Sequence, residues 1–117
     1  MKIIKSNIEN IENEKKMLYR LTKGTSLSLS NLDDDQLDQS WPVDASIIYE
    51  DPNQSGTTHT IIAILSGHTV LSGQSQPFRD SFLEIVDIME DEPFSIHIVH
   101  RISGKNKRKY VTCTLDC

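Results

Sequence analysis

Four cations stand within five residues near the end of the chain, and their type and spacing suggest a chemistry directly. They are Lys105, Lys107, Arg108 and Lys109, and Ser103 and Gly104 lead into them. Cationic side chains this close together attract phosphate groups and release the counterions that surround a nucleic acid. A basic turn is also a common means of keeping a protein soluble. The segment therefore predicts either a phosphate-binding surface or a solubilising turn.

Base stacking requires exposed aromatic rings, which we expect among the rings at predicted strand positions. These rings are Tyr19, Trp41, Tyr49, Phe94 and Tyr110. Strand aromatics usually belong to the core, so a buried role stands beside a stacking role for each of them. Trp41 stands next to a proline among polar residues, and we expect it to be the most exposed, followed by Tyr49 and Tyr110. The predicted nucleic-acid-binding residues are Tyr49, Tyr110, Trp41, Arg101, Lys105, Lys107, Arg108 and Lys109.

The other reactive side chains predict no enzyme, no metal site and no cofactor. Cys113 and Cys117 have no second cysteine pair beside them, whereas a structural zinc site takes about four ligands. His97 and His100 differ by three positions within one predicted strand, so they point to opposite faces. The acidic run at residues 31–39 lacks the glycine and the glutamate of a calcium loop, so we expect a solvated loop or a one-turn helix.

Charge is unevenly distributed along the chain. The net charge is −5, yet residues 25–93 carry thirteen anions and one cation, while residues 94–117 carry five cations and one anion. Only the local field within about 8–10 Å of a contact matters at ordinary salt, so an acidic total does not exclude nucleic-acid binding. With 117 residues, 37% of them apolar, the chain is long enough for one modest core.

Apolar alternation predicts most of the secondary structure. Residues 94–99 and 110–115 predict two antiparallel strands around the basic turn. Further strands are predicted at residues 17–21, 26–30, 41–50, 59–65 and 68–72, with the strongly apolar run at 59–65 central in its sheet. Pro77 begins a predicted helix that extends to about Glu90. Its buried stripe is predicted to be Phe78, Phe82, Ile85, Val86 and Met89.

The order of these elements predicts a mainly β protein with one helix. With residues 17–30 taken as one bent strand and the short strand at residues 68–72 set aside, the order is strand, strand, strand, helix, strand, strand. That is the connectivity of an OB-fold, a five-stranded barrel whose helix lies between strands three and four. In that layout the basic turn joins strands four and five and flanks the nucleic-acid groove. An α+β sheet with one packed helix fits the same order. We expect residues 1–16 to form an N-terminal arm or short helix, and residues 17–117 to form a single OB-like β domain.

From Trp41 onward the chain resembles the small single-stranded-DNA-binding proteins of protein-primed podophages that infect Gram-positive bacteria. The matching features are a strand that ends in Tyr49, the apolar strand at residues 59–65, the helix around residues 82–87, and the Ser-Gly-Lys turn at residues 103–105. The resemblance implies a β-rich bacteriophage protein that coats displaced strands during DNA replication. It also implies that Tyr49 contacts DNA, with Tyr110 near another aromatic position of the pattern.

We therefore predict a viral single-stranded-DNA-binding protein without sequence preference; self-association and binding to replication proteins remain open. The alternative is an acidic inhibitor or immunity-type module that binds a protein through the acidic segment. No apolar run approaches the ~18 residues of a membrane span, and residues 1–5 lack the apolar core of a signal peptide. We accordingly expect a cytoplasmic protein, in the host cell if it is viral.

Overall fold

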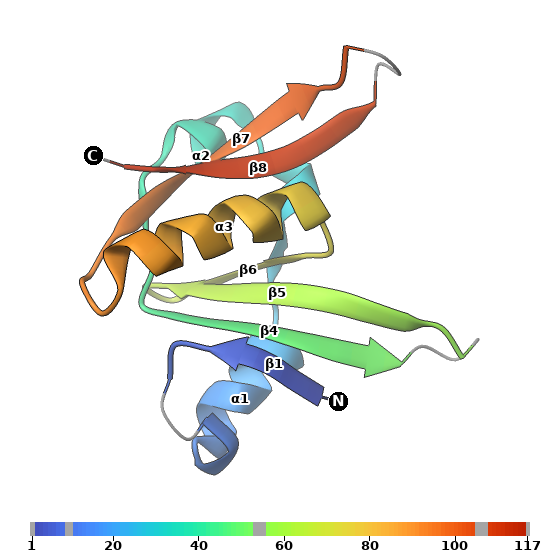
Figure 1. Cartoon of the computed structure of the whole chain (residues 1–117), viewed down its shortest axis with the longest axis vertical. Coiled ribbons are helices and arrows are strands. Elements are labelled where there is room, and N and C mark those ends of the chain that lie inside the picture. The colour runs from blue at the N-terminus through green and yellow to red at the C-terminus, as the bar shows by residue number, and fades with distance from the viewer. Residues whose placement is uncertain (1, 9–10, 53–55, 105–107, 117) are drawn as a thin grey trace. The chain divides into compact units, whose positions relative to one another are not determined.

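The computed structural model describes residues 2–8, 11–52, 56–104 and 108–116. These residues form a mainly β structure, with 43% strand and 30% helix. A five-stranded sheet has the order β1-β4-β5-β6-β2, and a three-stranded sheet has the order β3-β7-β8 (Figure 1). Neither sheet is closed, so the barrel of an OB-fold is not confirmed. The chain divides into two compact units, Met1–Leu27 with Asp44–Gln74 and Ser28–Val43 with Ser75–Cys117.

The sheet of the first unit is built around β5. Its strands are β1 (Lys2–Ser6), β4 (Ala45–Pro52), β5 (Thr58–Ser66), β6 (Thr69–Gly73) and the short edge strand β2 (Leu27–Ser28). β5 is central in this order, as its apolar run predicts, and it pairs antiparallel with β4 and β6. Consecutive residues of β5 from Ile62 to Leu65 are buried. Both faces of the strand are therefore covered, which explains why its apolar run does not alternate.

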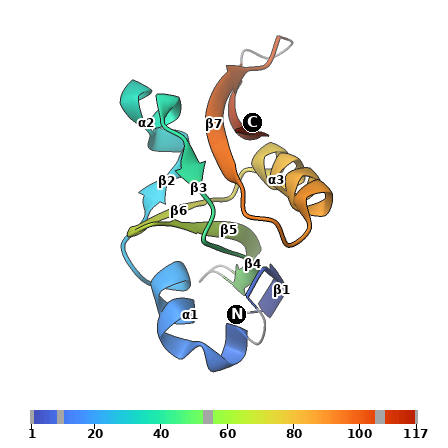
Figure 2. The ribbon, with the colours of Figure 1, turned by 90° about the vertical axis from the view of Figure 1, so that its left-hand side faces the viewer.

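A helix packs against one face of this sheet. The 3-10 turn η1 (Ile11–Asn13) and the helix α1 (Lys15–Thr22) lie on one side of the sheet (Figure 2). They bring Ile11 and Leu21 to a cluster of side chains from β4, β5 and β6. Residues 1–16, which were predicted to form an arm or a short helix, contain β1, η1 and the first two residues of α1.

The prediction of a strand at residues 17–21 is wrong, because these residues belong to α1. Met17, Leu18 and Leu21 recur at helical spacing and face the apolar cluster, whereas Tyr19 is 66% exposed on the other side. Gly24 follows the end of the helix, and a Cβ atom there would come within 2.7 Å of the Arg20 carbonyl oxygen. A side chain at that position would therefore collide with the last turn.

The sheet of the second unit is the predicted hairpin with one short strand added. The hairpin consists of β7 (Ser95–Ile102) and β8 (Lys109–Leu115), and β3 (Trp41–Pro42) pairs with β7. The single strand predicted at residues 41–50 is instead divided between β3 and β4, which belong to different sheets. Pro42 has no N–H to donate, which the edge strand β3 tolerates, and the next residue, Val43, still donates its N–H to the Phe94 carbonyl oxygen at 3.0 Å.

The predicted C-terminal helix is confirmed as α3 (Gln76–Met89). Ser75 caps it, since its Oγ accepts a hydrogen bond from the Phe78 N–H at 3.2 Å. Phe78, Phe82 and Ile85 are buried, as the apolar stripe predicts. The helix lies beside β8 (Figure 1). Between them, Ser81 Oγ and Thr112 Oγ1 are 2.7 Å apart.

The expectation of one helix is wrong, because the described residues contain three α-helices. The second is α2 (Asp34–Asp38), the one-turn helix that was one of the two predictions for the acidic run. Asp33 and Gln36 stabilise it through a capping box, in which each side chain accepts the other residue's backbone N–H. A 3-10 turn, η2 (Leu29–Asn31), precedes it and replaces the last two residues of the strand predicted at residues 26–30. None of the helices in the described ranges is long and apolar enough to cross a membrane.

Candidate nucleic-acid interface

The β7–β8 hairpin changes character along its length. Near its base, Ile96 and Ile98 of β7 are buried, and the half-buried His97 lies between them. Toward the turn the alternation ends, and His100, Arg101 and Ile102 are all exposed. In both views the outer end of the hairpin extends beyond α2 and α3 of the same unit (Figures 1 and 2). This end is therefore the part of the hairpin that is open to a partner.

Cations and a tyrosine share the outer end of the hairpin. Arg101 lies directly opposite Tyr110 in the register of the two strands, and Ile102 lies opposite Lys109. Side chains of directly opposed residues have Cβ atoms about 4.5–5.5 Å apart and share a face. Arg101 and Tyr110 therefore present a guanidinium and a ring, 37% exposed, on one face, and Lys109 lies on the other.

Carboxylates do not neutralise the described cations of this region. Within the described ranges, neither Arg101, Arg108 nor Lys109 forms an ion pair with an acidic side chain. The Ser103 N–H donates to the Arg108 carbonyl oxygen at 2.8 Å and fixes the start of the turn. The predictions for Lys105 and Lys107 lie outside the described residues.

A surface hollow adjoins these side chains. It is lined by Pro77, at the beginning of α3, and by residues 102–104 and 108–110 of the hairpin. The hollow thus collects two of the three described cations and the tyrosine at one place. Its lining is mixed, since Ile102 is 64% exposed there beside Arg108 and Lys109.

Two of the predicted stacking residues are buried. Trp41 is 4% exposed, and its Nε1–H donates to the Gln36 carbonyl oxygen at 3.0 Å, which ties α2 to the three-stranded sheet. The expectation that Trp41 is partly exposed is therefore wrong. Tyr49 is also 4% exposed and belongs to the apolar cluster beneath α1. Its burial, and secondarily the charge of Asp51, raise the pKa of its hydroxyl. Neither ring presents a face to a base in this structure.

A second group of polar side chains lies at the base of the hairpin. The Ser40 hydroxyl and the His97 Nε2–H, the latter at 3.1 Å, both donate to the Asp116 carboxylate. These two hydrogen bonds, that of Ser40 first, lower the pKa of Asp116. The carboxylate thus stands between the serine and the histidine, whereas a catalytic triad needs the histidine next to the serine. The arrangement ties β3 and β8 to β7, and it does not activate the hydroxyl.

The described residues offer little support for a metal site or for a reactive cysteine. No three His, Cys, Asp or Glu side chains within them are grouped so that they could hold a metal ion. Cys113 is buried, as its strand position predicts, and burial raises the pKa of its thiol to about 12. A thiol with so high a pKa is a poor nucleophile and a poor metal ligand at neutral pH.

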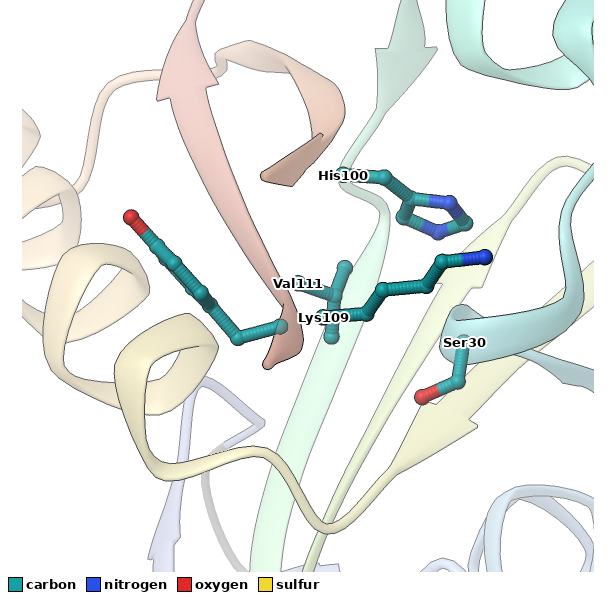
Figure 3. A pocket seen from close by; sticks show the side chains of 5 residues that line it. Ser30, His100, Lys109 and Val111 are labelled. Atoms are coloured by element: carbon teal, nitrogen blue, oxygen red, sulfur yellow. The ribbon is translucent and has the colours of Figure 1, made fainter. Parts of the chain in front are cut away.

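A small pocket near Lys109 was not predicted from the sequence. Ser30, His100, Lys109, Tyr110 and Val111 line it. His100 Nε2 lies 2.8 Å from the Leu29 carbonyl oxygen, which fastens η2 to β7. No local pattern links η2 to the hairpin, because they are far apart in the sequence. Only the fold brings Ser30 and His100 to Lys109 (Figure 3).

Comparison of the chain with protein-family models, curated proteins and solved structures finds no match. The interpretation of the interface therefore depends on its residues and their geometry.

Proposed function

We propose that this protein binds single-stranded DNA, without sequence preference, through the outer end of the β7–β8 hairpin. The observation that supports the proposal most is the exposure of Tyr110 beside Arg101, Arg108 and Lys109 on that end, with no carboxylate paired to these cations in the described ranges. A ring and unpaired cations on a projecting hairpin provide both interactions that a flexible strand requires.

The two interactions have separate physical roles. Arg101, Arg108 and Lys109 attract backbone phosphates, and the release of counterions makes the affinity fall with salt. An unpaired base that stacks on Tyr110 adds ~1–3 kcal/mol, whatever its identity, because every base has a π-face. Neither interaction reads base edges, which is why we propose binding without sequence preference.

The proposed biological role rests on the resemblance to the podophage proteins. In that setting the protein coats strands displaced during viral DNA replication, in the cytoplasm of the host cell. Trp41 and Tyr49 have no stacking role in this proposal, because both are buried. An OB-type groove is not required either, since the hairpin alone carries the ring and the cations.

The stacking role of Tyr110 is tested by the substitution Tyr110→Ala. We expect the affinity for fluorescently labelled oligo-dT, measured by anisotropy at low salt, to fall roughly 5- to 150-fold, which corresponds to one stacked base. Tyr19→Ala is the matched control, because Tyr19 is exposed on α1 of the first unit. Equal affinities of Tyr110→Ala and the wild-type protein would show that the ring of Tyr110 is not part of the interface.

The alternative is that the protein binds a basic protein partner through the acidic helix α2. Asp33, Asp34 and Asp35 are exposed there. Their exposure favours α2 as the binding surface over the rest of the acidic segment. A folded protein that binds no oligo-dT at low salt would make it the leading hypothesis. Asparagine at these three positions would then abolish binding to the partner, while the asparagine that replaces Asp33 could still cap the helix.

A further inference from the structure

The pocket beside Lys109 has the size and the lining of a small-anion site. Its volume is ≈ 80 Å³, and its lining comes from η2, β7 and β8 of the second unit. This volume is enough for several water molecules, and a small anion therefore fits in the pocket. Figure 3 shows Lys109 extending beneath the His100 ring, with Ser30 on the same side of the strand.

His100 fixes the geometry of this pocket. A carbonyl oxygen only accepts hydrogen bonds, so the contact of 2.8 Å with Leu29 requires that His100 donate its Nε2–H. This bond holds η2 against β7 and thereby places Ser30, the next residue after Leu29, in the lining with Lys109. His100 is therefore a positioning residue, whereas the charge comes from Lys109.

The donors of the pocket match a phosphate group. Lys109 supplies an ammonium with three N–H donors, Ser30 supplies a hydroxyl, and Val111 forms an apolar wall. In the described part of the chain, none of the side chains that line the pocket is acidic. Charge-assisted hydrogen bonds from an ammonium are about twice as strong as neutral ones, and lysine binds phosphate as a point charge.

We propose that this pocket binds a phosphate group, with Lys109 as its cation and Ser30 as its neutral donor. The assignment of this phosphate to a nucleic acid rests on the proposed function. Lys109 and Tyr110 are consecutive residues of β8, so a strand whose phosphate lies at Lys109 can place a neighbouring base at Tyr110 across the strand edge. The phosphate is either an internal phosphodiester or a terminal monoester.

The pocket is tested first with inorganic phosphate alone, by following the amide signals of the ¹⁵N-labelled protein by NMR. We expect saturable shifts at Ser30, His100 and Lys109. We also expect roughly tenfold weaker binding in Lys109→Gln, together with a smaller loss in Ser30→Ala. Lys16→Gln is the matched control, because Lys16 is an exposed lysine of α1 that does not line this pocket. Saturable shifts that are the same in Lys109→Gln as in the wild-type protein, or no shifts at these residues, would overturn the proposal.

The source of the phosphate is tested with two oligo-dT strands of one length, one with a 5′-hydroxyl and one with a 5′-phosphate. Shifts of the pocket signals with both strands identify an internal phosphodiester, and shifts with the 5′-phosphate strand alone identify a terminal monoester. If inorganic phosphate binds the pocket but neither strand binds the protein, the proposed function fails while the phosphate site stands. If both strands bind without moving the pocket signals, the proposed function stands and the pocket is not its phosphate site.

Discussion

Adjacent residues of β8 carry different interactions in our account, because the side chains of a strand alternate between its faces. Tyr110 lies opposite Arg101 in the register, whereas Lys109 lies opposite Ile102; both Lys109 and Tyr110 contribute to the lining of the pocket at Ser30. A substitution of Tyr110 should therefore weaken stacking most, and a substitution of Lys109 should weaken phosphate binding most. The two proposals are told apart because oligo-dT affinity and the binding of inorganic phosphate are measured separately.

The sequence could predict which residue types lie on the hairpin, but not which rings are exposed. Alternation assigns a side chain to one face of a strand without saying what covers that face. Trp41 is buried, and its Nε1–H donates to the carbonyl oxygen of Gln36 in α2. Tyr49 is covered by side chains of η1 and α1. Both covering contacts depend on tertiary structure, and the polar residues around Trp41 in the chain do not indicate them.

At the residue scale, the hydrogen bonds of Asp116 predict a pH-dependent contribution to stability. The pKa of Asp116 is lowered in the folded protein by Ser40 and then His97, so the folded state favours the ionised carboxylate. Its contribution is complete above the pKa of the unfolded chain, ~3.9, and is lost as the pH falls through the lower folded-state pKa. We expect Asp116→Asn to be less stable than the wild-type protein near pH 7, with the difference vanishing at strongly acidic pH.

Urea unfolding of both proteins from pH 7 down to pH 2 measures this difference. Asp91→Asn is the control, because Asp91 is an exposed aspartate in the turn that follows α3. A difference between Asp116→Asn and wild type that stays constant with pH would show that the ionised carboxylate contributes nothing to stability.

At the element scale, the helices show when a sequence pattern suffices. The helix α3 could be predicted because Pro77 and a long stripe of apolar residues both favour it over 14 residues. The helix α1 has only eight residues, and the consecutive apolar residues Met17 and Leu18 are as typical of a short strand as of a helix. Its packing onto the cluster around Ala63 and Leu65 decides between the two, and such packing is invisible in the local sequence.

The hydroxyl of Ser75 joins two elements, which leads to a prediction about stability. Ser75 Oγ accepts the Phe78 N–H and donates to the Val111 carbonyl oxygen at 2.9 Å, so it caps α3 and ties it to β8. Removal of a cap costs ~0.5–2 kcal/mol, and removal of a further hydrogen bond costs ~1 kcal/mol. We expect Ser75→Ala to lower the free energy of unfolding by about 1–3 kcal/mol.

Chemical denaturation measures this loss, with Gln74→Ala as the control, because Gln74 is exposed immediately before the cap. A loss in Ser75→Ala no larger than that in Gln74→Ala would mean that the hydroxyl does not hold α3 to β8. The measurement is independent of DNA binding, since Ser75 is not among the proposed contact residues.

At the scale of the whole molecule, the strands could be predicted more reliably than their partners. The hairpin and the β5–β6 pair join neighbours in the sequence, and short turns indicate such pairs. The pairing of β1 with β4, and of β3 with β7, joins distant segments and has no local signature. The sequence therefore predicted one OB-like barrel or one sheet with a packed helix, and the structure has two sheets, neither of them closed.

The distribution of charge over the whole chain bears on the central claim. The protein carries a net charge of −5, which repels nucleic acid at long range, yet Arg101, Arg108 and Lys109 are exposed together on one hairpin. If the hairpin binds the strand, the salt dependence of the affinity must come mainly from the cations of this hairpin. Cations elsewhere on the surface should contribute little, because the Debye length is only ~10 Å at 0.1 M salt.

The most direct test is the salt dependence of oligo-dT affinity in three proteins: wild type, Arg108→Gln/Lys109→Gln, and Lys15→Gln/Lys16→Gln. Lys15 and Lys16 are exposed on α1 of the first unit, so the third protein loses the same charge from residues outside the hairpin. We predict that the slope of log K against log salt becomes shallower by ~1.4 in the hairpin variant, about 0.7 for each phosphate that is no longer neutralised. The α1 variant should keep the wild-type slope. Equal slopes in the wild type and the hairpin variant would contradict binding through this hairpin.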